Sequence, residues 1–134
     1  MTTKRDQLFF DLFITAIEGG INYWGGVAKY KWQTADGADD ILGFNAVVVD
    51  LEDDTEYVVD RAVIAKGFNK IAKAKGPFYD PNGANTQCAD VKYLGPGLAK
   101  AVREAAFDPD EADFDAGDAD TILQVGLFGE VVYG

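Results

Sequence analysis

The first apolar segment of the chain repeats with the period of an α-helix. Between residues 4 and 18, apolar side chains recur three and four positions apart, at Phe9, Leu12, Phe13, Ala16 and Ile17. This spacing predicts an amphipathic helix. Three more apolar residues, Leu8, Phe10 and Ile14, widen its apolar face beyond what one neighbour would cover. We therefore expect this helix to be central or to form a subunit contact, and expect a homo-oligomer. Gly19-Gly20 could end the helix, or the helix could continue to Trp24.

The next segments have the pattern of β-strands. Residues 27–33 alternate between apolar and polar positions, and residues 43–51 are rich in β-branched valines. Residues 56–59 follow after the acidic turn Glu52-Asp53-Asp54-Thr55. Because two such runs joined by a short turn form a hairpin, the pattern predicts a three-stranded antiparallel meander.

Three further helices are predicted after the strands. Asp60 is a typical N-cap for a helix over residues 61–75, which Gly76-Pro77 would stop, and Pro96 suits the first turn of a helix over residues 96–107. Residues 119–133 are apolar almost all round, as in a buried helix. We therefore predict a single α+β domain over residues 1–134: an N-terminal helix, a three-stranded antiparallel meander, and three further helices packed on one face. The buried C-terminal helix should lie beside the first helix in the core.

The composition removes several classes of enzyme. The 134 residues include no histidine, no serine and a single cysteine, Cys88. Ser-His-acid triads, Cys-His pairs and His-ligated zinc sites are therefore excluded. Carboxylate chemistry, a lysine nucleophile and Cys88 without a histidine partner remain. Neither a Walker loop nor GxGxxG occurs, and we expect no cofactor.

The sequence is typical of a cytoplasmic protein without a membrane partner. The apolar run after Lys4 and Arg5 is interrupted by Asp11, which is unlike a signal peptide. No stretch approaches the roughly 20 apolar residues that cross a bilayer. One cysteine cannot form an internal disulfide, so nothing indicates an oxidising compartment.

The net charge of −11 argues against direct nucleic-acid binding, which requires clustered Lys and Arg. The charges are sorted along the chain. Residues 33–60 contain nine acids and no base, residues 61–76 five bases and no acid, and residues 104–134 nine acids and no base. Lys66, Lys70 and Lys73 share one stripe of the predicted second helix. This stripe could hold an anion such as a nucleotide phosphate, or could be a solvated face that balances neighbouring acids.

Two acidic clusters are candidates for an acidic binding surface. One is the predicted hairpin tip, and the other is the linker before the last helix; together they comprise Glu52, Asp53, Asp54, Asp108, Asp110, Glu111, Asp113 and Asp115. Carboxylates this dense are what Ca²⁺ or Mg²⁺ requires, but the linker lacks the sixth-position glycine and twelfth-position acid of a calcium loop. We therefore predict no metal site. The linker could instead stabilise helix N-termini, or face a protein partner.

The most distinctive local string is Glu18-Gly19-Gly20-Ile21-Asn22-Tyr23-Trp24. Two glycines followed by amide and aromatic groups could form a flat wall for a ligand, or a helix end whose aromatic side chains fill the core. Glu18 and Glu130 have matching places near the ends of two predicted helices. If they met, such paired carboxylates could act as acid and base.

Two strings, ITAIEGGINYW over residues 14–24 and ADTILQVGLFGEVVYG over residues 119–134, resemble a group of small uncharacterised bacteriophage and prophage proteins, especially those of actinobacteria. The residues most typical of that group are Glu18, Gly19, Gly20, Asn22, Tyr23, Trp24, Phe128, Gly129, Glu130, Tyr133 and Gly134. The resemblance implies a viral accessory protein that acts inside an infected bacterium.

Three functions follow from these observations. The leading hypothesis is a non-enzymatic phage accessory protein that binds a host or phage protein through its acidic surface, including a form in which carboxylates imitate nucleic-acid phosphates. The second is a protein that binds or sequesters a nucleotide-type small molecule, and the third is a carboxylate- or metal-dependent enzyme. The candidate ligand- or partner-binding residues are Glu18, Asn22, Tyr23, Trp24, Glu130 and Tyr133.

Overall fold

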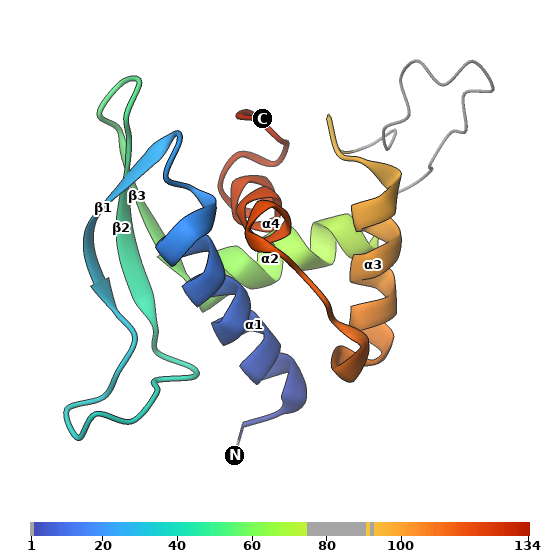
Figure 1. The fold of residues 1–134 in the computed structure, drawn as a ribbon, viewed down its shortest axis with the longest axis horizontal. Helices are drawn as coiled ribbons and strands as arrows, with labels where there is room; N and C mark the ends of the chain where they lie inside the picture. The colour runs from blue at the N-terminus through green and yellow to red at the C-terminus, as the bar shows by residue number, and fades with distance from the viewer. Residues whose placement is uncertain (1, 75–90, 92) are drawn as a thin grey trace.

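The computed structural model describes residues 2–74, 91 and 93–134, and it has the predicted α+β architecture (Figure 1). The elements in chain order are α1 (Lys4–Thr15), the π-helical turn η1 (Ala16–Gly20), β1 (Gly25–Lys31), β2 (Asn45–Asp50), β3 (Glu56–Asp60), α2 (Arg61–Ala72), α3 (Pro96–Phe107), the 3₁₀ turn η2 (Pro109–Glu111) and α4 (Ala116–Phe128). The strands form one antiparallel sheet in the order β1-β2-β3. The helices lie on one side of this sheet (Figure 1).

Helix α1 begins at a capping box and buries most of its apolar face inside the chain, with Ile14 only partly buried. The Thr3 hydroxyl accepts a hydrogen bond from the Asp6 amide, and the Asp6 carboxylate accepts one from the Thr3 amide. The ring of Phe9 packs edge-on against Phe68 of α2, with centroids 5.2 Å apart. Leu8 and Phe10, which widened the apolar face, are buried as well. The width of this face therefore gives no support to an oligomer.

The helix ends at Gly20 and does not continue to Trp24. Its last turn widens, so that the Ile21 amide donates to the Ala16 carbonyl across five residues. Gly20 lies against the start of α4, where a Cβ on Gly20 would be 2.6 Å from the Ala116 carbonyl oxygen. The glycine thus allows the end of the first helix and the start of the last one to touch, which confirms their predicted adjacency.

The sheet is the predicted meander. Residues 52–54 form the tip of the β2–β3 hairpin, where the Asp53 carboxylate accepts from the Thr55 amide at 3.0 Å. Val48 and Val59 point into the core, and a register shift between Val27 and Lys29 interrupts the β1–β2 ladder. Strand β1 starts at Gly25, two residues earlier than predicted, because Gly25 pairs with Asp50 at the end of β2.

Helices α2 and α3 follow their predicted starts. The Asp60 side chain caps α2 by accepting from the Val63 amide at 3.1 Å. Helix α3 has the predicted bounds, and it packs mainly against α2, so it is separated from the sheet. The predicted extent of α2 to residue 75 is too long, because the helix ends at Ala72 with Lys73 at its C-cap. The expected stop signal Gly76-Pro77 itself lies outside the described residues.

The predicted extent of the last helix, residues 119–133, is wrong at both ends. Asp115 caps α4, so the helix starts three residues earlier, and it ends at Phe128. Gly129 ends it with a φ of 78°, a left-handed conformation that glycine adopts without strain. Residues 130–134 then leave the helix, and their apolar character comes from packing against other elements.

Helix α4 occupies the centre of the molecule and crosses α2 at very short range. A Cβ on Gly67 of α2 would lie 2.0 Å from the Ile122 carbonyl oxygen, and one on Gly126 of α4 would lie 2.2 Å from the Val63 carbonyl oxygen. The two backbones therefore touch with no side chain between them. In the part of the chain that the structure describes, no helix combines the length and apolar character needed to cross a membrane.

Candidate functional site

The residues that follow α4 return to the end of the sheet that carries the β2–β3 hairpin (Figure 1). The ring of Tyr133 stacks on the indole of Trp24, with centroids 5.2 Å apart and ring planes 8° from parallel. Phe128, at the end of α4, packs edge-on against both rings. Tyr23, Trp24 and Tyr133 are thus brought together as parts of one cluster.

Gln124 holds the returning segment to α4. Its side chain is 0% exposed, and its Oε1 accepts from the amides of Val132 and Tyr133 at 2.9 and 2.8 Å. Its Nε2 donates to the Tyr133 carbonyl at 2.9 Å. One buried amide group therefore satisfies three backbone groups of a segment that has no regular secondary structure of its own.

Asp120, one turn before Gln124, is the polar centre of the cluster. It is 3% exposed and accepts from Trp24 Nε1 at 2.7 Å, from the Tyr23 hydroxyl at 2.5 Å and from Gln124 Nε2 at 3.0 Å. Within the described residues it forms no ion pair. Hydrogen bonds from three donors, two of them aromatic side chains, offset the loss of water around its oxygens.

The Tyr133 hydroxyl connects the cluster to the hairpin. It donates to Asp50 Oδ2 at 2.5 Å, and Glu52 Oε2 lies 3.3 Å away. Asp50 is buried at the end of β2, and its other oxygen accepts from the Glu52 amide at 2.9 Å. The hydrogen bond to Asp50, followed by burial, raises the pKa of Tyr133.

Tyr23 presents its ring to solvent and its hydroxyl to the interior. The residue is 56% exposed, but its hydroxyl lies between Asp120 and the Tyr133 carbonyl oxygen. Burial of the hydroxyl, followed by its hydrogen bond to Asp120, raises the pKa of Tyr23 to about 12. Both phenols therefore keep their protons at neutral pH and serve as donors, which makes them poor general bases.

These raised pKa values predict a loss of stability in strong alkali. The folded protein holds the Tyr23 and Tyr133 protons to higher pH than the unfolded chain does. Their stabilising contribution should be complete below about pH 10 and should be lost as the pH rises from about 10 to about 12. A spectrophotometric titration at 295 nm should show late ionisation that the substitutions Tyr23→Phe and Tyr133→Phe each reduce. Late ionisation that persists unchanged in both variants would contradict the assignment.

Two shallow hollows lie on either side of the returning segment. The first has a volume of about 340 Å³ and is lined by Tyr23, Asp50, Leu51 and Glu52, among others. The second has a volume of about 410 Å³ and lies between Tyr23, Asp120 and Val131. The exposed ring of Tyr23 borders both. Lys66, Lys70 and Lys73 line neither hollow, although the Lys70 ammonium lies 3.3 Å from where a Cβ on Gly129 would be.

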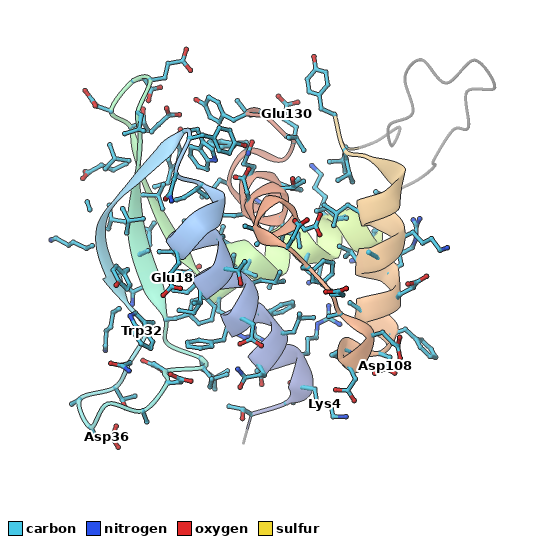
Figure 2. The ribbon with its side chains drawn as sticks, in the orientation of Figure 1. Lys4, Glu18, Trp32, Asp36, Asp108 and Glu130 are labelled. Carbon is cyan, nitrogen blue, oxygen red and sulfur yellow. The ribbon has the colours of Figure 1, made fainter. Side chains whose placement is uncertain are left out.

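The other predicted site residues do not join this cluster. Glu18 and Asn22 are exposed, and the side chain of neither forms a hydrogen bond with a described residue. Glu130 is half-buried, and Figure 2 shows it well apart from Glu18. The two glutamates therefore do not form the acid–base pair that their matching positions suggested.

The acidic linker acts largely as a set of helix caps. Asp108 accepts from the Asp110 amide at 3.1 Å, and Asp115 accepts from the Asp118 amide at 2.8 Å. Asp110 also forms an exposed ion pair with Lys4, with nitrogen and oxygen 2.5 Å apart. No three carboxylates or thiols among the described residues are placed to hold a metal ion. Asp108 and Asp115 thus act as the helix caps that were one interpretation of the linker.

The acidic residues do not gather on one face. Figure 2 shows Asp36 and Asp108 at opposite sides of the molecule, and the hairpin tip lies at the other end of the sheet from Asp36. At that tip, Glu52, Asp53 and Asp54 are exposed, and no Lys or Arg of the described chain pairs with them. These tip carboxylates border the first hollow through Glu52.

Asp50, Asp120 and Gln124 were missed as site residues in the sequence. Asp120 and Gln124 stand four positions apart in a run that is otherwise mostly apolar, so they share one face of a buried helix. Polar side chains in such a place need hydrogen-bond partners, and that is the signal that could have identified them. Comparison of the chain with known protein families, with curated proteins and with solved structures finds no match.

Proposed function

We propose that this protein is a non-enzymatic binding protein that recognises a cationic segment of another protein at its hairpin tip. The surface involved, here called the tip surface, consists of Tyr23, Leu51, Glu52, Asp53 and Asp54. The proposal rests mainly on one observation: exposed carboxylates that form no ion pair with a described residue stand beside an exposed aromatic ring and an exposed leucine, which are 56% and 59% accessible.

The chemistry of the tip surface suits lysine and arginine side chains. Carboxylates attract such residues over a long range and accept their hydrogen bonds at contact. The ring of Tyr23 offers a face for a cation, and tyrosine is enriched at protein interfaces. Asp120 fixes the Tyr23 hydroxyl at 2.5 Å, so little side-chain entropy is lost when a partner binds.

The resemblance to phage proteins suggests in which cell the partner would be found. The partner would be a host or phage protein in the bacterial cytoplasm, and its basic segment could be one that otherwise contacts nucleic acid. If the carboxylates take the place of nucleic-acid phosphates, binding of the basic segment should weaken as salt is added, because salt screens the attraction between the charges.

A nucleotide or an enzymatic reaction has less support from the contacts. One face of the Trp24 indole is already stacked on Tyr133, and carboxylates border the hollow beside it. Those carboxylates would repel phosphate groups. The raised pKa of both phenols also opposes a role for either as a base near neutral pH.

The test is binding of a defined basic probe by a variant that changes only the tip. The double variant Glu52→Gln with Asp54→Asn removes two carboxylates and leaves the Asp53 cap in place. A fluorescent decapeptide of alternating arginine and glycine serves as the probe, with anisotropy measured at low ionic strength. We expect the dissociation constant to rise roughly tenfold, which corresponds to about 1.4 kcal/mol.

The matched control is Glu111→Gln with Asp113→Asn, which removes the same charge from the acidic linker. It should change the dissociation constant by less than about twofold, because these residues lie away from the tip. If both double variants weaken the probe equally, the peptide responds only to net charge and the proposal fails. Absence of probe binding to the unmodified protein at low salt would also overturn it.

A further inference from the structure

Three aromatic side chains and two carboxylates line the first hollow, which borders the tip surface. The hollow has a volume of about 340 Å³, and its lining includes Tyr23, Trp24, Tyr133, Asp50 and Glu52. The faces of aromatic rings attract cations, and carboxylates add negative charge. No Lys or Arg of the described chain forms an ion pair with either carboxylate. The hollow therefore suits a positively charged group that also has apolar surface.

Two of the three rings have a face that is open to a ligand. The ring of Tyr23 is exposed, and Tyr133 uses one face to stack on Trp24. Phe128 lies 5.8 Å from Trp24 and 6.2 Å from Tyr133, between ring centroids. A ring on the outer face of Tyr133 would be at least about 7 Å from Trp24, because each ring-to-ring contact spans about 3.5 Å. Phe128 therefore lies beside the stack and does not cover the outer face of Tyr133.

The buried carboxylate of the hollow already has hydrogen-bond donors. Asp50 Oδ2 accepts from the Tyr133 hydroxyl at 2.5 Å, and Oδ1 accepts from the Glu52 amide at 2.9 Å. A lysine ammonium has three N–H donors and is strongly hydrated, so it would lose bonds to water that Asp50 is poorly placed to replace. A trimethylated ammonium keeps the charge and has no N–H donor. The hollow thus favours the methylated cation.

We propose that the first hollow receives a trimethylated lysine side chain of the cationic partner segment. The methylated ammonium lies against the rings of Tyr23 and Tyr133, and Asp50 and Glu52 supply the opposite charge. Aromatic pockets recognise methylated lysine through such contacts between a cation and ring faces. This inference rests on the proposed function, because the tip carboxylates hold the lysine and arginine residues that flank the methylated one.

Two peptides that differ only in methylation test the inference. Each is the fluorescent arginine–glycine decapeptide with one central glycine replaced by lysine or by trimethyl-lysine, and anisotropy gives both dissociation constants. We expect the trimethyl-lysine peptide to bind about fivefold more tightly, as for one partly desolvated contact between a cation and a ring. Tyr23→Leu should lower this ratio to about one, whereas Tyr23→Phe keeps the ring and should keep most of the preference.

Tyr30→Leu is the matched control for the loss of a ring. Tyr30 is 52% exposed and lines neither hollow, so this variant should keep the full preference. Circular dichroism of each variant should match that of the unmodified protein. A Tyr23→Leu variant that keeps the preference, or a Tyr30→Leu variant that loses it, would overturn the inference.

The unmodified protein separates this inference from the proposed function. Equal binding of the lysine and trimethyl-lysine peptides would overturn the inference alone, because the peptide of arginine and glycine tests the tip carboxylates without any lysine. If none of the peptides binds, the proposed function fails as well.

A free ammonium compound tests whether the ligand is a protein side chain. Choline is compared with its uncharged carbon analogue, in which a tert-butyl group replaces the trimethylammonium group, and the Trp24 indole N–H signal is followed by NMR. Choline should shift this signal more than the analogue does, but it should bind at least about tenfold more weakly than the trimethyl-lysine peptide, because it lacks the flanking arginines. Equal shifts by choline and the analogue would show that charge is not recognised. Choline that binds as tightly as the peptide would overturn the assignment to a protein side chain.

Discussion

Replacement of Gly67 by alanine is expected to destabilise the protein by about 3 kcal/mol or more, or to prevent folding. The added methyl carbon would lie 2.0 Å from the Ile122 carbonyl oxygen and 2.8 Å from the Gly126 amide nitrogen. Both obstacles are backbone atoms of α4, so no change of rotamer can relieve the clash. Alanine favours helices by about 1 kcal/mol over glycine, which is too little to compensate.

Urea unfolding followed by circular dichroism measures this loss, and Gly97→Ala is the matched control. Gly97 also lies in a helix, in the first turn of α3, but no atom of the described residues lies within 4 Å of its Cβ position. The same substitution there should be neutral or stabilise by up to about 1 kcal/mol. A Gly67→Ala variant as stable as the Gly97→Ala variant would show that α2 and α4 do not cross as described.

The second large effect is expected for Gln124→Leu. Leucine is close to glutamine in size but cannot replace the hydrogen bonds to the Val132 amide, the Tyr133 amide and the Tyr133 carbonyl. The segment must then leave these groups unsatisfied or detach and lose the stacking of Tyr133 on Trp24. Either outcome should lower the free energy of unfolding by about 2–4 kcal/mol.

Hydrogen exchange distinguishes this specific loss from a general loss of stability. In Gln124→Leu the amides of Val132 and Tyr133 should exchange much faster, while those in the centre of α2 should follow global stability. Gln7→Leu is the control, because Gln7 is exposed and, among the described residues, its side chain bonds to Asp11 alone. It should change stability by less than about 0.5 kcal/mol. Unchanged protection of the two amides in Gln124→Leu would contradict the role given to Gln124.

The local pattern of apolar and polar residues predicted most of the fold, because the residues of each buried face lie within one short stretch of sequence. The spacing of Phe9, Leu12 and Phe13 indicates the buried face of α1. Asp60 marks the start of α2, because its side chain accepts a hydrogen bond from the amide of Val63, three residues later. The end of α4 could not be predicted in this way. Apolar residues continue past Gly129, because Val131 and Tyr133 pack against other elements instead of continuing the helix.

The candidate site was predictable only in part because its contacts are distant in sequence. The aromatic residues Tyr23, Trp24 and Tyr133 were identified by their character, but only the tertiary fold places them on Asp120. The matching positions of Glu18 and Glu130 near two helix ends suggested a pair, but Glu18 is exposed to solvent and does not meet Glu130. Sequence position along an element gives no information on which ends meet across the core.

The contact between Tyr23 and Tyr133 has a consequence for when the cluster can form. These residues are 110 positions apart, so no shorter stretch of the growing chain contains both sides of the cluster. Local helices and hairpins form within microseconds, whereas a ribosome adds about 5–20 residues per second. The hairpin can therefore be in place seconds before its aromatic partner is synthesised. The indole of Trp24, which Tyr133 covers in the folded protein, would remain open to chaperones until the segment with Tyr133 leaves the ribosome.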